Sequence, residues 1–221
     1  MSLFKTVTSK PWTREQALLD DQFQGSAFQA SPATLGLRIF LGVVTVLFLL
    51  LYVAYSGRIV FPDWRGLPEP SLLWVNTIVL ILCSLVYMRA QSAAATGRMG
   101  PFKNNLLLAG LLSLTFVLGQ LLAWRELVDL GFYASVNPIN GFFYLLTGLH
   151  GVHLLGGLIV WLHTALKAFR GENPAALAQT TRLLAHYWHF LLLIWIVIFV
   201  SVPQFLTLFP EERWKTWCSL I

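Results

Sequence analysis

Four histidines of this chain stand in two pairs with the same spacing. His150 and His153 are three residues apart in the run GLHGVHLLGG, and His186 and His189 are three residues apart in AHYWHF. Side chains three residues apart share one face of a helix, and imidazole is a common ligand of transition metals and of haem iron. One interpretation is therefore a haem or a dinuclear metal site between two helices.

A second interpretation gives the same histidines structural partners. Metal sites in helical bundles usually include carboxylates, and the apolar segments that carry these histidines contain no Asp or Glu. Polar side chains at membrane depth are satisfied by neighbouring helices or, near the helix ends, by lipid headgroups. We favour this interpretation, in which His150, His153, His186 and His189 bind lipid or lock helices together, and the chain has no catalytic residue, metal or cofactor of its own.

The composition of the chain is typical of a membrane protein. The chain has 221 residues, of which 57% are hydrophobic and only 11% charged. Soluble domains have about 25% charged residues, so this chain is predicted to be an integral membrane protein. Its net charge of +5 comes from basic residues in short connections, a pattern that favours a topology signal over a nucleic-acid surface.

Five apolar segments without charged residues predict the fold. Each has about the 20 residues that are needed to cross the hydrocarbon core. We expect an all-α bundle of five transmembrane helices over residues 34–209, between a polar segment 1–33 and a short tail 210–221. Asn137 followed by Pro138 is a typical helix start. The expected spans are about 35–57, 70–89, 104–124, 138–166 and 183–208.

The distribution of basic residues predicts the orientation. The N-terminal segment and the second and fourth loops hold nine Lys and Arg residues, whereas the opposite side holds five. Cytoplasmic loops are enriched in Lys and Arg. We therefore expect a cytoplasmic N-terminus and a periplasmic C-terminus.

Small and polar residues within the spans predict helix contacts. Gly148, Gly151 and Gly156 fall on one side of the fourth helix at 100° per residue, where they would let a neighbouring helix approach closely. Asn76 and Gln120 are lone amides in the second and third spans, and we expect them to form interhelical hydrogen bonds.

Arg38 lies near the start of the first span. Its long side chain can reach the cytoplasmic headgroups, which makes it either a topology anchor or a ligand of lipid phosphate.

These runs together resemble a known family. GFFYLLTGLHGVHLLGG is similar to the G-x-H-x-x-H-x-x-x-G helix of cytochrome c oxidase subunit III, and HYWHFLLLIWIVIF is similar to the YWHF helix of that family. Asn76-Thr77 and the run GQLLAW also match, and the resemblance covers about residues 35–205.

The resemblance implies a non-catalytic, lipid-binding subunit of a bacterial respiratory haem-copper oxidase in the plasma membrane. Such a subunit packs against catalytic subunit I, with subunit II and smaller subunits as further partners, and the haem and copper lie in those partners. It supports the stability of the oxidase and oxygen access. The matching positions His150, His153, Trp188 and His189 would contact lipid or lock helices.

Three positions depart from the family pattern. Val44, Ala123 and Leu192 stand where family members commonly have an acidic residue. These apolar replacements put in question any role in proton uptake.

Three alternatives stay open at this stage. The first is the subunit-III-like companion of a nitric oxide reductase, which would share the same motifs. The second is a membrane haem or quinol-binding protein that uses the HxxH pairs. The third is a small transporter, which the absence of acidic residues from the spans disfavours.

Overall fold

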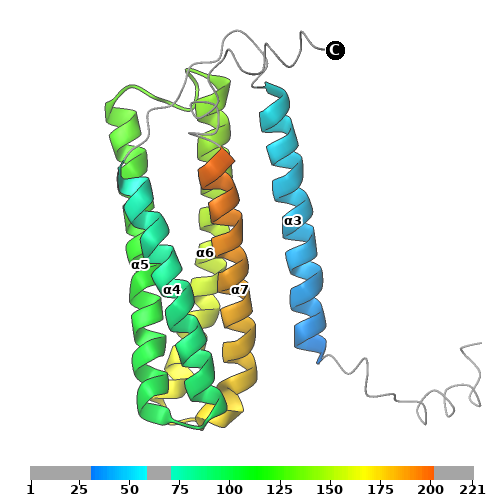
Figure 1. The fold of residues 1–221 in the computed structure, drawn as a ribbon, viewed down its shortest axis with the longest axis vertical. Helices are drawn as coiled ribbons and strands as arrows, with labels where there is room; N and C mark the ends of the chain where they lie inside the picture. Colours follow the sequence, from blue (N-terminus) through cyan, green and yellow to red (C-terminus); the bar gives the residue numbers. More distant parts are fainter. Residues whose placement is uncertain (1–30, 59–70, 202–221) are drawn as a thin grey trace, which may run out of the picture. The chain divides into compact units, whose positions relative to one another are not determined.

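The fold was obtained as a computed structural model, which describes residues 31–58 and 71–201 (Figure 1). Within these ranges the chain forms α-helices and no strand. All five helices are long and apolar enough to cross a membrane, so the predicted all-α fold is confirmed. The helices are α3 (Pro32–Arg58), α4 (Leu72–Ala95), α5 (Met99–Asp129), α6 (Pro138–Phe169) and α7 (Pro174–Ser201).

Several predictions fall on other parts of the chain. Most of the polar segment 1–33, the tail 210–221 and the end of the fifth span beyond residue 201 lie outside the described residues.

The helices extend further than the spans predicted from charge. α5 continues to Asp129 rather than ending near residue 124, and α7 begins at Pro174 rather than near residue 183. The side chain of Asn173 caps α7, since its Oδ1 accepts a hydrogen bond from the backbone N–H of Ala175 at 3.0 Å. Charged residues mark the edge of the hydrocarbon core, but a helix can continue past that edge into the interface.

The central helix α6 begins and ends with local signals in the sequence. The Oδ1 atom of Asn137 accepts a hydrogen bond from the N–H of Ile139 at 3.1 Å, and Pro138 occupies the first helical position, where no N–H is needed. This start was predicted and is confirmed. At the other end Gly171 has a φ of +90°, and the N–H of Glu172 bonds back to the carbonyl of Lys167 at 3.2 Å. This glycine-based cap reverses the chain into α7.

Helices α4 to α7 each pack against two of the others, in the cyclic order α4, α5, α6, α7. The short connections α4–α5 and α6–α7 make these neighbours antiparallel (Figure 1). Aromatic side chains with almost no exposure fill the space between the four helices. The largest are Trp188, Trp195, Tyr87, Phe102, Phe116 and Phe143.

Residues 39–58 of α3 contact α6 through large side chains. The rings of Phe40 and Phe48 lie 6.1 and 5.7 Å from the His153 ring, and the Tyr55 ring lies 5.9 Å from that of Phe142. α3 is therefore antiparallel to α6. Only 11% of its most apolar window is buried, against 33–44% for the other helices, so most of α3 presents apolar side chains outward.

Candidate functional site

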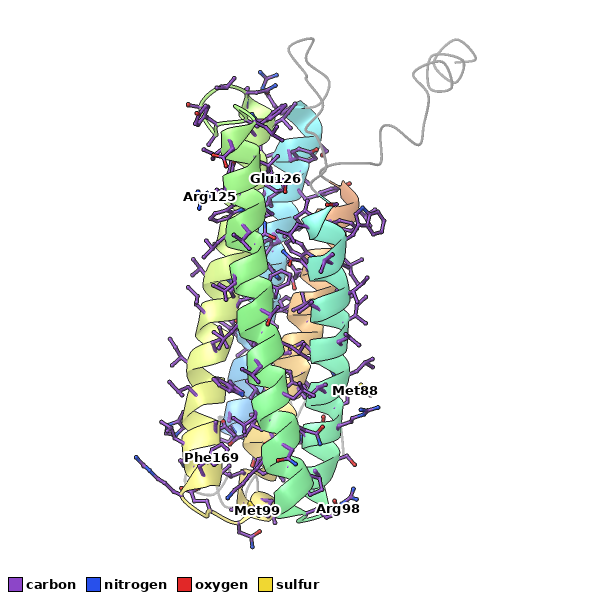
Figure 2. The ribbon with its side chains drawn as sticks, turned by 90° about the vertical axis from the view of Figure 1, so that its left-hand side faces the viewer. Met88, Arg98, Met99, Arg125, Glu126 and Phe169 are labelled. Carbon is purple, nitrogen blue, oxygen red and sulfur yellow. The ribbon has the colours of Figure 1, made fainter. Side chains whose placement is uncertain are left out.

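Basic residues collect at one end of helices α4 to α7. Lys103, in the first turns of α5, lies 5.4 Å above the ring of Phe169 at the end of α6, so these two helix ends are adjacent. Figure 2 shows Arg98 and Phe169 at this end and Arg125 at the other. Among the described residues 39–58 and 71–201, the other end holds Arg58 and Arg125, and the basic end holds Arg89, Arg98, Lys103, Lys167, Arg170 and Arg182.

His150 is enclosed by aromatic rings. It is 1% exposed, and its ring centre lies 6.0 Å from that of Phe116 on α5 and 5.4 Å from that of Trp195 on α7. Neither ring nitrogen has a hydrogen-bond partner among the described residues. His150 therefore belongs to the packed interior and does not face lipid.

His153 faces α3, and its imidazole forms a hydrogen bond within its own helix. Its Nδ1 donates to the carbonyl of Leu149 at 2.7 Å, and its ring contacts those of Phe40 and Phe48. The backbone carbonyl of His153 accepts a hydrogen bond from the Tyr187 hydroxyl at 2.7 Å. This residue therefore links α6 to both α3 and α7.

The histidines of α7 have different surroundings. His186 is exposed, and its Nδ1 donates to the carbonyl of Arg182 at 2.7 Å. His189 is half-buried, and its Nδ1 forms a hydrogen bond with the Ser84 hydroxyl of α4. Within the part of the chain that the structure describes, no three His, Cys, Asp or Glu side chains are close enough to share a metal ion.

Trp188 is a packing residue between three helices. It is 1% exposed and stacks on Tyr87 of α4, with ring centres 5.1 Å apart and planes at 15°. A Cβ atom at Gly157 of α6 would lie 3.4 Å from its ring. The surroundings of Trp188 therefore favour helix locking over lipid contact.

The closest helix approaches occur at glycines that the sequence analysis did not select. A Cβ at Gly110 would overlap the Trp161 indole, and a Cβ at Gly157 would come within 2.8 Å of the Tyr187 ring. The predicted packing glycines have more room: a Cβ at Gly148 would lie 3.5 Å from Trp124, one at Gly156 would lie 3.9 Å from the Tyr187 hydroxyl, and one at Gly151 would meet nothing within 4 Å. A packing role for Gly151 therefore stays a proposal.

The two lone amides are buried, with exposures of 2% for Asn76 and 6% for Gln120. The Nδ2 of Asn76 and both polar atoms of the Gln120 side chain have no hydrogen-bond partner among the described residues. Other side chains make the interhelical bonds at this level: Trp195 Nε1 donates to Thr77 Oγ1 at 3.0 Å, and Trp124 Nε1 donates to Thr147 Oγ1 at 3.1 Å.

Arg38 is exposed on α3, two turns after the helix begins at Pro32. A role in binding lipid phosphate stays a proposal.

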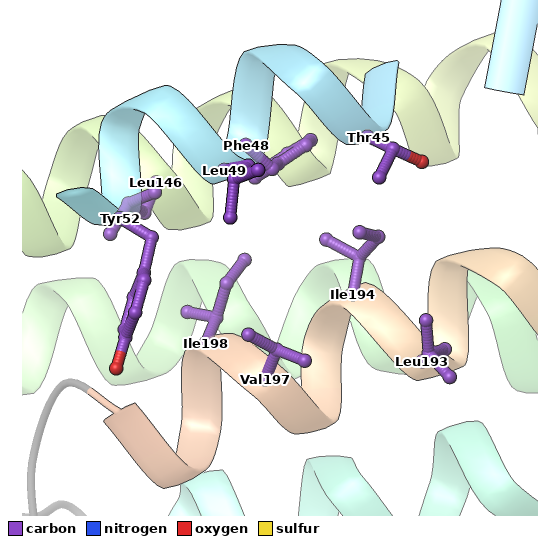
Figure 3. Close-up of a pocket in the computed structure, with 9 residues that line it drawn as sticks. All are labelled: Thr45, Phe48, Leu49, Tyr52, Leu146, Leu193, Ile194, Val197 and Ile198. Carbon is purple, nitrogen blue, oxygen red and sulfur yellow. The ribbon is translucent and has the colours of Figure 1, made fainter. Parts of the chain in front are cut away.

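An apolar cavity of about 180 Å³ lies between α3, α6 and α7 (Figure 3). The only polar atoms of its lining side chains are the hydroxyls of Thr45 and Tyr52, and the Thr45 hydroxyl donates to the carbonyl of Leu41 in its own helix at 2.8 Å. The cavity therefore suits a hydrocarbon ligand. Its lining consists of Thr45, Phe48, Leu49, Tyr52, Leu146, Leu193, Ile194, Val197 and Ile198.

Comparison with known proteins places the chain in a family. The sequence matches the family described as cytochrome c oxidase subunit III over residues 2–206. The chain belongs to the cytochrome c oxidase subunit III family.

Three similar proteins carry the name cytochrome c oxidase subunit 3. A probable one from Mycobacterium tuberculosis H37Rv is 31% identical over 126 residues, which are 57% of this chain and 62% of the relative. The protein from Synechocystis sp. PCC 6803 is 31% identical over 176 residues, 76% of this chain and 73% of the relative. The protein from Bacillus subtilis 168 is 26% identical over 200 residues, 83% and 96% respectively. The chain thus spans less than two thirds of the mycobacterial relative.

The three positions that depart from the family pattern have different surroundings. Val44 is 2% exposed and Ala123 is fully buried, whereas Leu192 is half-buried. A carboxylate at Val44 or Ala123 would be costly without a partner, which accounts for apolar residues in this packing.

The Ser84–His189 hydrogen bond is expected to stabilise the contact between α4 and α7. Ser84→Ala should lower the free energy of unfolding by about 0.5–1.5 kcal/mol, because the bond is lost in a partly buried setting. Unfolding in mixed detergent micelles, followed by circular dichroism, measures the change. Ser56→Ala is the matched control, since Ser56 is exposed and bonds to the Val53 carbonyl of its own helix. Equal effects of the two substitutions would contradict the prediction.

Proposed function

We propose that the chain acts as subunit III of a bacterial haem-copper terminal oxidase in the plasma membrane, as a lipid-binding structural subunit with no redox centre. The family match over residues 2–206 carries this proposal. Its partners would be catalytic subunit I, subunit II and smaller subunits, and the haem and copper would lie in those partners.

The surroundings of the histidines support a structural role. His150 is packed between two aromatic rings, and the Nδ1 atoms of His153 and His186 bond to carbonyls of their own helices. His189 bonds to Ser84 on the neighbouring helix. These imidazoles serve packing and hydrogen bonding, which are the contributions that a supporting subunit needs.

The distribution of basic residues supports a cytoplasmic N-terminus. Within the described residues 39–58 and 71–201, six Lys and Arg side chains lie at one end and two at the other. Because α3 is antiparallel to α6, residue 39 lies at the basic end. The positive-inside rule assigns that end to the cytoplasm.

Purification of the tagged chain from its native membranes tests the assignment. We expect co-purification of a haem-containing catalytic subunit and a copper-binding subunit II, and no haem spectrum from the separated chain. A nitric oxide reductase subunit in place of the oxidase subunits would support the companion alternative. A haem spectrum that stays with the separated chain would overturn the structural role.

The lipid-binding part of the proposal rests on the cavity between α3, α6 and α7. An acyl chain placed there would gain dispersion contacts with the aliphatic side chains of α7 and with the Phe48 ring. The acyl chain would also fill the cavity between α3, α6 and α7, and it would thereby hold α3 in place.

Filling the cavity is expected to displace lipid. Val197→Phe adds a ring at the lining, so the purified complex should retain fewer phospholipids per chain, as measured by native mass spectrometry. Val152→Phe is the matched control, because Val152 is 63% exposed and is not part of the lining. Equal lipid content in the two variants would argue against an acyl chain in this cavity.

A further inference from the structure

A layer of polar side chains crosses helices α4 to α7 at one level. The hydrogen bond from Trp195 to Thr77 joins α7 to α4, and the bond from Trp124 to Thr147 joins α5 to α6. Three more buried polar side chains lie on α4, α5 and α6, and they are Asn76, Gln120 and His150. We call the whole set the polar layer: Asn76, Thr77, Gln120, Trp124, Thr147, His150 and Trp195.

The positions of the three remaining side chains follow from contacts of their neighbours in the sequence. Asn76 lies directly against α5, since a Cβ at Gly119 would overlap its Oδ1 atom. Gln120 is the next residue on α5.

Contacts one turn away on either side place Gln120 opposite His150. Phe116 contacts the His150 ring at 6.0 Å, and Trp124 bonds to Thr147. Gln120 lies midway between Phe116 and Trp124 along α5, so it faces the turn of α6 that ends with His150.

Five polar atoms of Asn76, Gln120 and His150 lack a partner among the described residues. They are Nδ2 of Asn76, Nε2 and Oε1 of Gln120, and Nδ1 and Nε2 of His150. All three side chains are at least nine-tenths buried. An unpaired buried polar group costs about 1–3 kcal/mol, so five of them would cost about as much as the whole 5–15 kcal/mol stability of a typical domain.

We propose that roughly one or two ordered water molecules bind between Asn76, Gln120 and His150. The site offers amide N–H donors, a carbonyl acceptor and an imidazole that can donate and accept, and a water molecule needs about two to four such partners. A bound cation would find no carboxylate in the polar layer, and a lipid headgroup cannot reach atoms that are fully covered by protein. The bound water completes the layer by joining α4, α5 and α6 through hydrogen bonds.

A cryo-electron-microscopy map of the native complex in lipid nanodiscs tests the site directly. The map must be sharp enough to show ordered water at other buried polar sites of the complex. We expect a peak at about 2.7–3.2 Å from polar atoms of at least two of the three side chains. Direct hydrogen bonds among Asn76, Gln120 and His150 with no peak between them would overturn the proposal, as would a metal ion at coordination distance.

A variant of similar shape tests the part played by Gln120. Gln120→Met removes both polar atoms, so the peak should disappear or lose its contact on α5. Leu121→Met is the matched control, because Leu121 is 52% exposed on the same helix, and its map should keep the peak. An unchanged peak in Gln120→Met would overturn Gln120 as a ligand of the water. The map of the unmodified complex decides the proposal if the variant does not assemble.

Discussion

Gly110→Ala is expected to lower the free energy of unfolding by about 1–3 kcal/mol, or to prevent assembly, because the interior would be overpacked. The added methyl group would overlap the Trp161 indole. That indole is held in place, since its Nε1 donates to the carbonyl of Leu106 at 2.7 Å. Relief of the overlap would therefore require α5 and α6 to move apart or the hydrogen bond to break.

Gly151→Ala is the matched control for this prediction. It makes the same chemical change on α6, but its Cβ would meet nothing within 4 Å. Unfolding of both variants in mixed micelles, followed by circular dichroism, gives the comparison. If Gly110→Ala were as stable as Gly151→Ala, the result would contradict the close contact between Gly110 of α5 and Trp161 of α6.

Trp188→Ala is expected to cost about 3–5 kcal/mol, the usual range for deletion of a large buried aromatic side chain. Trp188 is 1% exposed, stacks on Tyr87 and lies against Gly157. The substitution would leave a cavity at the junction of α4, α6 and α7. We expect a lower unfolding free energy and weaker retention of the chain in the proposed oxidase complex.

Trp74→Ala provides the control, because the same volume is deleted from a side chain that is 51% exposed. Trp74 contacts Phe199 edge to face at 4.8 Å, so a smaller loss is expected there. A loss at Trp74 that equals the loss at Trp188 would show that Trp188 is not a central packing residue.

The sequence was sufficient to predict the helices but not how they pair. Charge-free segments of the right length predict five spans, and Asn137-Pro138 predicts the start of α6, because these signals are local. The extra turns of α7 before residue 183 were missed, since the charge of Arg182 was taken as a boundary. A helix can carry such a side chain at the level of the headgroups.

Pairing and register could not be predicted because the helices are apolar on all sides. A helix of that kind has no amphipathic face that shows which side is buried. Gly151 looked like a packing glycine, yet a Cβ there would meet nothing within 4 Å, whereas a Cβ at Gly110 would overlap Trp161. The antiparallel alignment of α5 and α6 brings Trp161 to Gly110. The burial of Asn76 and Gln120 could not be predicted either, because the side chains that cover them come from helices distant in the sequence.

The polar layer has a consequence for how four nearly uniform apolar helices select one alignment. Leucine-rich surfaces in hydrocarbon gain similar dispersion contacts when one helix slides along another by a turn of about 5.4 Å. Such a slide would carry the Trp195 indole N–H away from Thr77 and the Trp124 indole N–H away from Thr147. Each displaced group would then lie unpaired in apolar surroundings, at a cost that the sliding contacts do not repay. These polar side chains therefore fix the register of the four helices. They stabilise the native bundle, and they also raise the free energy of bundles in which one helix is shifted by a turn.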